Sequence, residues 1–582
     1  MSESAPGYFD SSRRLTGPNL YFHDCAAIAD VLAADDAQVA DWESRVRRMV
    51  AALEWPEPAI SIDRHAGGAS LAFTAPLDQL LSATEVNEWA WQGAAVAVQA
   101  LPLPQAPGYP TTWDFDSALE TIRCFAAAES NQKAMMLLAI ASQHGLPAFY
   151  DDDSISVGAG QGSRTWPLTE LPANLADVDW TGLHDIPTVL VTGSNGKTTT
   201  VRLLAAMFGA AGKPAGFNCT DGVFIDGEQV ETGDFSGPSG ARQVLRDTRV
   251  QAAVLETARG GILRRGLAVN HANAGIVTNI SPDHFGEYGV HDLARLADAK
   301  LVLARAIGAD GVLVLNADDA LLVEKSANLA CPLAWFSLDH MNPRLQMVRA
   351  AGGMSCGVAD GELLLHVDGL AHRLGAVARM PLTIAGSARY NIANLAGAAL
   401  VAAALGIAAD VIARVLSEFG SHRLDNPGRL ERWQIGGADV LLDYAHNPDG
   451  LRGLLAVAEE IRTRSGGRLG LLLGQAGNRD DKAIRELACT AAAARPEWVV
   501  LKDMAGYMRG RDSGAVPAVL RDELLRQGVA EASVHTILVE VDAAVALLEW
   551  ARPGDVLVLP VHNLDARAEL VSLLDARSAL AS

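Results

Sequence analysis

The feature that most constrains this chain is a short apolar run that leads through a glycine loop into a helix-forming segment. Residues 188–191 predict a buried strand, residues 193–196 a tight loop with glycine at both ends, and residues 197–207 a helix. This order places backbone N–H groups and a helix N-terminus where phosphate oxygens bind. A lysine in the loop can reach the β- and γ-phosphates, and the hydroxyl after it can ligate Mg²⁺. The sequence therefore predicts a site for a nucleotide and Mg²⁺ on Gly193, Asn195, Gly196, Lys197, Thr198 and Thr199.

One position departs from the generic phosphate-binding pattern, which has a glycine five residues before the Gly-Lys pair. Val191 occupies that position, so a glycine-rich turn with a surface lysine is the alternative interpretation. The Lys197-Thr198 pair and the two flanking elements favour the phosphate site. The shorter form, Gly-Ser-Asn-Gly-Lys-Thr-Thr, resembles the loop of the Mur ligase family. Enzymes of that family use ATP to join an amino acid to a carboxylate, so the resemblance implies ATP as the cofactor.

Length and composition limit the fold class and the partners. A chain of 582 residues is too long for one core, and 49% hydrophobic residues suit several globular domains. The formal net charge of −22 argues against a nucleic-acid partner, whose phosphates would be repelled. The six cysteines lie far apart without a Cys-x-x-Cys pair, which suits a reducing cytosol and indicates no zinc site.

The N-terminus and the apolar runs bear on localisation. The first residues show no basic and then apolar signal pattern. The longest apolar run, residues 395–409, is alanine-rich and shorter than the ~18 residues that a membrane span needs. We interpret this run as one buried helix, and we expect a cytoplasmic protein without a membrane partner.

Three segments differ in their pattern of strands and helices, and together they predict an α/β fold. Residues 1–180 mix both patterns around a proline-rich loop at 103–110, which predicts an α+β N-terminal domain. Residues 183–425 alternate apolar strands with helices, which predicts a mostly parallel sheet covered on both faces, and the resemblance of the loop implies that this is a Mur ligase-like P-loop central domain. Residues 426–582 predict a smaller, Rossmann-like α/β domain. The strands predicted in the last two segments are residues 252–255, 274–278, 311–315, 469–473, 498–501 and 555–559.

Polar residues near the ends of predicted strands are candidates for metal binding and catalysis. Glu256 can hold Mg²⁺, and a solvated strand-end carboxylate is the alternative. Residues 279–284 resemble the Mur motif Asn-x-x-x-Asp-His, in which the histidine serves a second metal; a helix-capping turn is the alternative. Lys300 matches a lysine that becomes a carbamate in many Mur ligases, which requires a neutral amine, and a solvated helix lysine is the alternative. The resemblance implies Lys197, His284 and Lys300 as catalytic residues and Thr198, Glu256 and His284 as metal ligands.

Further matches concern the nucleotide. Residues 391–394 match the family's Asn-x-x-Asn at the adenine, although Tyr390 replaces the usual preceding histidine. A Pro-Gly pair marks a hinge just before Arg429, whose guanidinium fork suits phosphate oxygens. Residues 443–448 match Asp-Tyr-Ala-His-Asn-Pro, in which the aspartate holds the ribose and the histidine lies near the phosphates. The resemblance thus adds Asn391, Arg429, Asp443 and His446 to the nucleotide site.

Within the family, the chain resembles the Mur ligase half of cyanophycin synthetase. The matching segments are residues 218–222, 233–238, 255–265, 474–481 and 508–514. The first two face the acceptor in that family and the last two lie near the incoming amino acid, although a solvated charged loop is an equal alternative for each of the last two. The candidate substrate contacts are Thr220, Asp221, Ser236, Arg259, Arg479 and Arg511.

The N-terminal segment carries a fainter resemblance to the same family. Residues 14–19 and 139–166 resemble its N-terminal domain, after which an ATP-grasp domain follows. Here the next strand already begins at residue 188, so we expect that the ATP-grasp domain is absent.

These patterns predict a ligase that activates a carboxylate as an acyl phosphate. The resemblance implies an aspartyl side chain or a peptide as the acceptor, a basic amino acid such as arginine as the donor, and a separate ATP-grasp protein or cyanophycin synthetase as partner. We also expect a homo-oligomer. One alternative is a non-catalytic partner of a full-length synthetase, and another is a P-loop NTPase that drives motion. The complete set of motif residues counts against the first, and the motif at 443–448 counts against the second.

Overall fold

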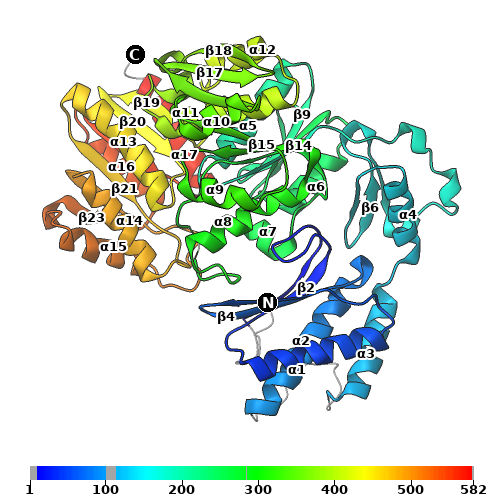
Figure 1. The fold of residues 1–582 in the computed structure, drawn as a ribbon. Coiled ribbons are helices and arrows are strands. Elements are labelled where there is room, and N and C mark those ends of the chain that lie inside the picture. The colour runs from blue at the N-terminus through cyan, green and yellow to red at the C-terminus, as the bar shows by residue number, and fades with distance from the viewer. Residues whose placement is uncertain (1–9, 100–112, 284, 580–582) are drawn as a thin grey trace.

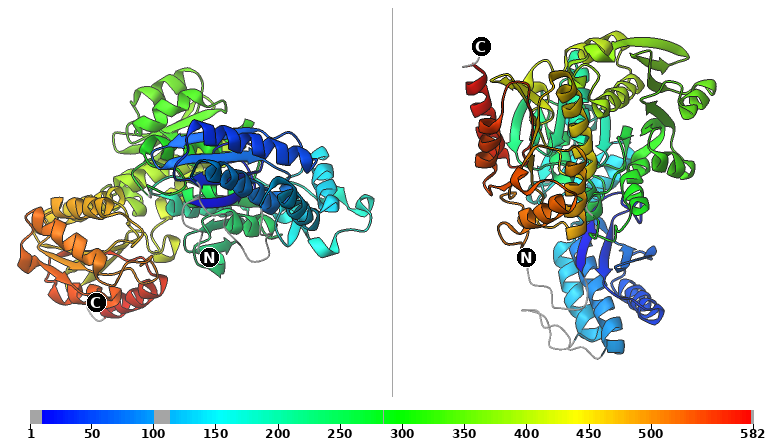
Figure 2. Two further views of the ribbon diagram at one scale, coloured as in Figure 1. Left: turned by 90° about the horizontal axis from the view of Figure 1, so that it is seen from below. Right: turned by 90° about the vertical axis from the view of Figure 1, so that its left-hand side faces the viewer.

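The computed structural model describes residues 10–99, 113–283 and 285–579, which form a large central sheet, a second α/β layer and a smaller N-terminal part (Figure 1). The left view of Figure 2 shows the C-terminal α/β part, orange to red, as a lobe beside the central sheet. The sheets fall within the three ranges expected from the sequence, and we retain 1–180, 183–425 and 426–582 as proposed domain limits.

The central sheet has eleven strands among the described residues. They are β8 (Thr188–Thr192), β9 (Ala215–Cys219), β10 (Gly222–Ile225), β11 (Glu228–Thr232), β12 (Ala252–Glu256), β13 (Ala272–Val277), β14 (Ile307–Asn316), β15 (Leu333–Ser337), β16 (Ser355–Ala359), β17 (Glu362–Val367) and β18 (Leu370–Ala376). Their order is β11-β10-β9-β12-β8-β13-β14-β15-β16-β17-β18. The strands from β9 to β16 in this order run parallel, and antiparallel hairpins extend both edges. The predicted mostly parallel sheet is confirmed.

Helices cover both faces of this sheet in its middle, where strands such as β8 and β12 are buried at every position. In β8, Val189 and Val191 pack into one core and Leu190 into the other. The first core includes α5 (Lys197–Ala210), α11 (Arg389–Ala404) and α12 (Ala409–Glu418). The second includes side chains of α6 (Pro238–Arg246), α7 (Arg259–Arg265), α8 (Leu293–Leu301), α9 (Ala320–Lys325) and α10 (Pro343–Ala350). Each such apolar side chain contributes about 1.5–3 kcal/mol when fully buried.

The C-terminal part is a second three-layer α/β unit. Its strands are β19 (Glu431–Ile435), β20 (Ala438–Asp443), β21 (Leu469–Leu473), β22 (Trp498–Leu501), β23 (Val534–Thr536) and β24 (Val556–Pro560), in the order β19-β20-β24-β21-β22-β23. Only β19 is antiparallel to its neighbour within this sheet. One face packs against α13 (Pro448–Ser465), α14 (Asp481–Ala493) and α15 (Ala515–Arg526), and the other against α16 (Glu540–Trp550) and α17 (Leu564–Ala579). This arrangement confirms the predicted Rossmann-like layer.

The N-terminal part is α+β, as predicted. It contains β1 (Ser11–Leu15), β2 (Ala26–Val31), β3 (Ile60–His65), β4 (Gly68–Thr74), β5 (Ala148–Tyr150), β6 (Ser154–Val157), β7 (Arg164–Pro167), α1 (Asp36–Ala52), α2 (Leu80–Gln99), α3 (Phe115–Glu129) and α4 (Gln132–Gln143). The antiparallel sheet β1-β2-β4-β3 buries one face under α1, α2 and α3. Its β1 edge lies against α7, where Arg13 Nε donates to the Leu263 carbonyl at 2.8 Å.

The structure corrects one expectation about local structure, and another lies outside the described residues. The run 395–409 is not one helix: α11 ends at Ala404, and a turn with Gly406 at φ +78° precedes α12. Left-handed backbone of this kind favours glycine and ends helices. The loop expected at 103–110 lies outside the described residues. Among the described helices, none is both long and apolar enough to cross a bilayer.

A buried leucine and an exposed leucine in the central part allow a direct test of stability. Leu400 in α11 is fully buried, whereas Leu370 in β18 is 62% exposed. Replacing Leu400 with alanine should lower the free energy of unfolding by about 2–5 kcal/mol, because it leaves a cavity in the core. The matched change Leu370→Ala should stay within about 0.5 kcal/mol. Urea unfolding followed by circular dichroism measures both, and equal losses would contradict the layer assignment.

Candidate functional site

The phosphate loop, residues 193–196, joins β8 to Lys197 at the start of α5, at the carboxyl edge of the central sheet. Gly193 has φ +150° and Gly196 has φ +85°, so both positions favour glycine. A Cβ atom at Gly193 would collide with the Thr278 hydroxyl, and one at Gly196 would collide with the Asn394 amide. The two glycines therefore allow the close approach that the sequence motif predicted.

The segment that follows β13 holds this loop in place. Ser194 N donates to the Asn279 carbonyl and Ser194 Oγ to the Ser281 carbonyl, both at 2.9 Å. Thr278 Oγ1 donates to the Asn195 carbonyl at 2.6 Å, and Asn195 N donates to Asn279 Oδ1 at 3.0 Å. Because β13 is the immediate neighbour of β8, these bonds fix the loop before any ligand binds.

The oxygen atoms beside the loop fit a magnesium ion. Thr198 Oγ1 donates to Glu256 Oε2 at 2.8 Å, and Thr220 Oγ1 lies 3.4 Å from Glu256 Oε1. The Lys197 amine donates to the carbonyls of Gly193 and Ser194. Mg²⁺ binds oxygen ligands and takes few from protein when phosphates and water supply the rest. This donor set suits such a shared site, and the described residues contain no cluster of three or more His, Cys, Asp or Glu side chains for a metal held by protein alone.

Burial controls the charge of two groups near the loop. Glu256 is 1% exposed, and burial raises the pKa of its carboxyl, against the effects of Lys197 and the Thr198 hydrogen bond. Lys300 in α8 is 3% exposed, and burial, with the nearby charge of Lys197, lowers the pKa of its amine well below 10.5. The buried position of Lys300 contradicts the alternative of a solvated helix lysine, and the lowered pKa favours the neutral form of the amine.

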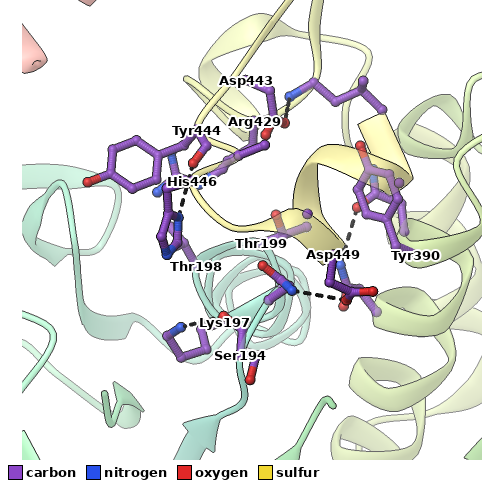
Figure 3. Close-up of a pocket in the computed structure, with 18 of the residues that line it drawn as sticks. Ser194, Lys197, Thr198, Thr199, Tyr390, Arg429, Asp443, Tyr444, His446 and Asp449 are labelled. Carbon is purple, nitrogen blue, oxygen red and sulfur yellow. Dashed lines mark hydrogen bonds between the residues drawn. The ribbon is translucent and has the colours of Figure 1, made fainter. Parts of the chain in front are cut away.

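A cavity opens between the phosphate loop and the C-terminal part (Figure 3), and we call this candidate site the nucleotide cavity. Its walls include Asn391, Asn394 and Tyr390 from α11, and Arg429, Asp443 and Tyr444 from the hinge and β20. Asp443 Oδ2 accepts from Leu430 N at 2.7 Å, and the Arg429 guanidinium stacks over the Tyr444 ring at 4.4 Å. Burial raises the pKa of the Asp443 carboxyl, although Arg429 opposes the shift.

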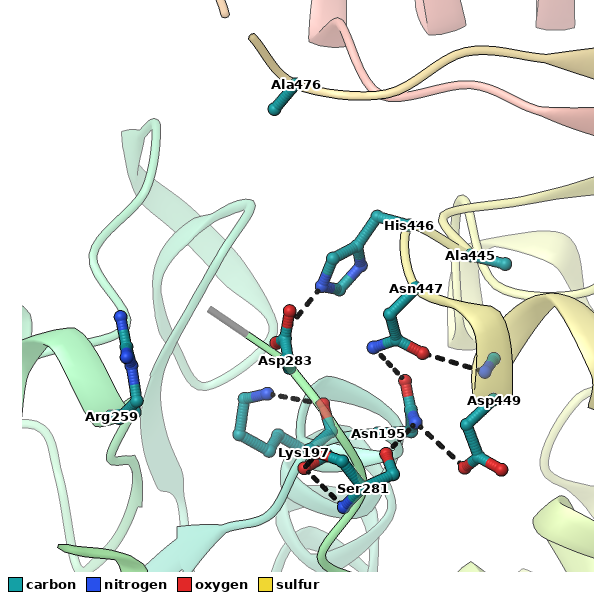
Figure 4. A network of polar contacts seen from close by, with 12 residues as sticks. Asn195, Lys197, Arg259, Ser281, Asp283, Ala445, His446, Asn447, Asp449 and Ala476 are labelled. Atoms are coloured by element: carbon teal, nitrogen blue, oxygen red, sulfur yellow. Dashed lines mark hydrogen bonds and ion pairs between the residues drawn. The ribbon is translucent and has the colours of Figure 1, made fainter. Parts of the chain in front are cut away.

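Polar contacts join the loop to the start of α13 (Figure 4). Asn195 Nδ2 donates to Asp449 Oδ2 at 3.2 Å, and Asn447 Nδ2 donates to Asn195 Oδ1 at 3.0 Å. Close by, Asp283 lies 3.7 Å from His446 Nε2 and accepts from Arg479 at 2.8 Å. The C-terminal part therefore contacts the phosphate loop through Asn447 and Asp449, and it contacts Asp283 through His446 and Arg479.

A larger cleft, about 1400 Å³ in volume, lies on the other side of the loop. Lys197, Thr220, Glu256, Tyr444 and His446 line both this cleft and the nucleotide cavity. Lys300 and Asp283 also line the cleft, and its far wall reaches the N-terminal part. Nine arginines line the cleft: Arg13, Arg14, Arg242, Arg246, Arg259, Arg264, Arg265, Arg479 and Arg509.

The six candidate substrate contacts do not all lie in one place: four line the large cleft, and two lie elsewhere. Thr220, Ser236, Arg259 and Arg479 line the large cleft. Arg511 instead supports a loop from behind, donating to the carbonyls of Gly477 at 2.9 Å and Arg479 at 2.8 Å. Asp221 lies at the junction with the C-terminal part, 3% exposed, where it binds Arg202 and Arg567 at 3.0 and 2.8 Å. His284 lies outside the described residues.

Sequence reasoning missed several residues of the site. Asp449 and Gly450, which directly follow the recognised motif, line the nucleotide cavity, and Asn279 anchors the loop. Arg567 in α17 reaches the junction from far along the chain and belongs to no motif. Spacing could have suggested Asp449, because it follows the motif directly, but nothing local marks Arg567.

Comparison with known proteins agrees with this geometry. The Mur ligase middle domain matches residues 191–402, and the Mur ligase glutamate ligase domain matches residues 428–560. The UDP-N-acetylmuramoyl-L-alanyl-D-glutamate--2,6-diaminopimelate ligase of Xanthomonas campestris is 30% identical over 59% of this chain and 68% of that protein. The chain belongs to the Mur ligase family.

Other relatives extend the comparison. Cyanophycin synthetase of Geminocystis herdmanii is 34% identical over 72% of this Mur ligase chain, which spans 48% of that protein. The chain thus covers about half the length of such relatives. A solved structure of Mycobacterium tuberculosis folylpolyglutamate synthase complexed with ADP has a TM-score of 0.48 and 18% identity, covering 67% of this chain and 90% of that chain.

The lowered pKa of the buried Lys300 predicts how the stability of the protein depends on pH. Between its lowered folded pKa and 10.5, the unfolded state holds a proton that the folded state lacks. This residue's contribution to stability therefore falls as the pH drops from 10.5 towards the folded pKa. In CO₂-depleted buffer without nucleotide, Lys300→Met should raise the thermal midpoint at pH 7, and the gain should shrink by about pH 10. Scanning calorimetry at both pH values measures this, with Lys482→Met at the surface as the control. An equal gain at both pH values would show that Lys300 is protonated in the folded protein.

Proposed function

We propose that this chain is an ATP-dependent ligase that joins the amine of an amino acid to a carboxylate through an acyl phosphate. The observation that carries the proposal is the shared wall of the two cavities. Lys197 and Glu256 line both, so a γ-phosphate bound at the loop would face the large cleft. An acceptor in the cleft could then reach that phosphate while ADP stays on the other side.

The reaction would proceed in two steps. An oxygen of the acceptor carboxylate attacks the γ-phosphorus, and the bond from that phosphorus to its bridging oxygen breaks, which leaves ADP and an acyl phosphate. The donor amine then attacks the acyl carbon, phosphate leaves with the electron pair, and the nitrogen loses a proton to give the amide. No enzyme nucleophile takes part, so the protein contributes positioning and charge.

The residues of the site have corresponding roles in this scheme. Thr198 and Glu256 would hold Mg²⁺, which, when bound, supplies positive charge against the phosphate oxygens. Lys197 would bind the transferring phosphate, and Lys300, as a neutral amine or a carbamate, would face the same end of the cleft. Asn391 would contact the adenine, Asp443 the ribose, and Arg429 and His446 the phosphates. His284 would support a second metal.

The charge of the cleft supports a carboxylate acceptor. Its nine arginines outnumber the carboxylates on the same lining, although the whole chain has a net charge of −22. We propose an aspartyl side chain or a peptide that carries one as the acceptor. The carboxylates of Asp234, Asp283 and Glu287 also line the cleft and suit a basic donor such as arginine.

We further propose that the C-terminal part closes about the hinge, and that a partner protein takes part in the reaction. Asn426 Nδ2 donates to Thr199 Oγ1 at 3.2 Å, so the first residue of the hinge contacts the first turn of α5, next to the phosphate loop. Closure about residues 426–429 would exclude water from the acyl phosphate. If the product is a polymer with two alternating bonds, a separate ATP-grasp protein or cyanophycin synthetase would form the other bond. Such a relative could also use this chain as a regulatory subunit.

An assay of ATP consumption tests the ligase. Phosphate release should require both an amine and a carboxylate in a screen of amino acids and aspartate-rich peptides. An ¹⁸O-labelled acceptor carboxylate should transfer one labelled oxygen to the released phosphate. Lys197→Ala should lower the rate at least about 100-fold, because it removes charge from the transferring phosphate.

The control for this assay is Lys213→Ala, beyond the opposite end of α5, which should keep the wild-type rate. Phosphate release that proceeds without an amine and carries no label would show an ATPase. Binding of ATP with no amide product under any pairing would favour the regulatory subunit.

A further inference from the structure

Lys502, Glu540 and His562 form a buried polar cluster that the mechanism above does not use. Lys502 directly follows β22, Glu540 begins α16, and His562 follows β24. Lys502 is 0% exposed, and its amine forms an ion pair with Glu540 and lies 3.2 Å from His562 Nδ1. Glu540 also accepts from the backbone N–H groups of His562 at 3.1 Å and Asn563 at 3.3 Å. A buried lysine needs such partners, because an unpaired charge in the interior is costly.

The cluster selects one tautomer of His562. His562 Nε2 lies 3.0 Å from the Ala445 carbonyl oxygen, which can only accept, so Nε2 must carry the proton. Nδ1 is then an acceptor, and the Lys502 ammonium is the donor that faces it. Burial, together with the charge of Lys502, lowers the pKa of His562 well below its ordinary value, so the ring is neutral. Glu540 balances the charge of Lys502.

Ala445 lies in the middle of the motif 443–448, which forms one wall of the nucleotide cavity. On its two sides, Tyr444 stacks with Arg429 and His446 faces Asp283. The Tyr444 ring also contacts the His562 ring, with centroids 5.2 Å apart. A hydrogen bond to the Ala445 carbonyl therefore fixes the backbone between the two side chains that line both cavities.

We propose that Lys502, Glu540 and His562 act together as positioning residues, with His562 Nε2–H holding the Ala445 carbonyl so that Tyr444 and His446 face the nucleotide. This inference rests on the proposed nucleotide site for its effect on activity. The hydrogen bond itself does not depend on the reaction. Lys502 donates to Nδ1 of His562 and so keeps the proton on Nε2. Glu540 balances the charge of Lys502 and so keeps its ammonium in place.

Two substitutions at His562 separate positioning from packing. The amide nitrogen of glutamine occupies nearly the place of Nε2, so His562→Gln keeps a donor to Ala445, whereas His562→Met fills similar space without one. Loss of one hydrogen bond corresponds to about a three- to ten-fold weaker equilibrium. We expect His562→Met to weaken ADP binding and raise the KM for ATP by that factor, and His562→Gln to stay within about two-fold of wild type.

A matched control lies in the same sheet. His535 Nε2 also lies 3.0 Å from a backbone carbonyl, that of Ala532, at the end of β23. His535→Met should leave ADP binding unchanged. Calorimetry measures ADP binding for all three variants, and hydrogen exchange of the peptide containing residues 443–450 should rise in His562→Met alone.

The two readouts separate failure of this inference from failure of the proposed function. If the wild type binds no ADP, the nucleotide site is wrong, and hydrogen exchange still decides whether His562 holds the motif. Unchanged exchange of residues 443–450 in His562→Met would overturn the positioning role. Equal losses in His562→Gln and His562→Met would also overturn it, because they would show that only packing matters.

Discussion

The hydrogen bond from Thr198 to Glu256 joins the first turn of α5, which follows β8, to the end of the adjacent parallel strand β12, and the rest of the site depends on the adjacency of these two strands. β8 carries the phosphate loop, β12 ends at Glu256 on one side of it, and β13 leads to Thr278 on the other. Parallel strands end at the same edge of a sheet, so loop, carboxylate and anchoring segment converge there. A strand order that did not place β12 and β13 beside β8 would separate these groups, whatever their sequence motifs.

The second constraint is the polar junction between the central and C-terminal parts. Asp221 binds Arg202 from α5 and Arg567 from α17, and Arg429 lies 4.0 Å away. Burial alone would raise the pKa of the Asp221 carboxyl. The three arginines outweigh that effect and hold the pKa below its ordinary value, so the carboxylate stays charged. These ion pairs lie beside apolar packing of Ala388 and Tyr390 on the C-terminal core. The junction is therefore partly polar, which is typical of contacts between domains that move relative to each other.

Local patterns predicted those features that depend on local physics. Glycines at 193 and 196, apolar strands and the motif 443–448 each carry their signal within a few residues, and the structure brings Lys197, Glu256, Asp443 and His446 around one loop. Asp221 and Arg511 are different, because an isolated charge in a loop gives no sign of whether it faces a ligand or another part of the chain. The break after Ala404 shows the same limit, since apolar composition alone does not reveal where the backbone turns.

Charge distribution shows why overall composition is a weak guide to substrate. The chain is strongly acidic, yet the large cleft is rich in arginine. At physiological ionic strength, exposed charges act over about 8 Å, so distant surface carboxylates have little influence inside the cleft. The arginines on its walls, some already paired with Asp151 and Asp152, set the local potential. The carboxylate acceptor that we propose would therefore be attracted to the cleft despite the negative charge of the whole chain.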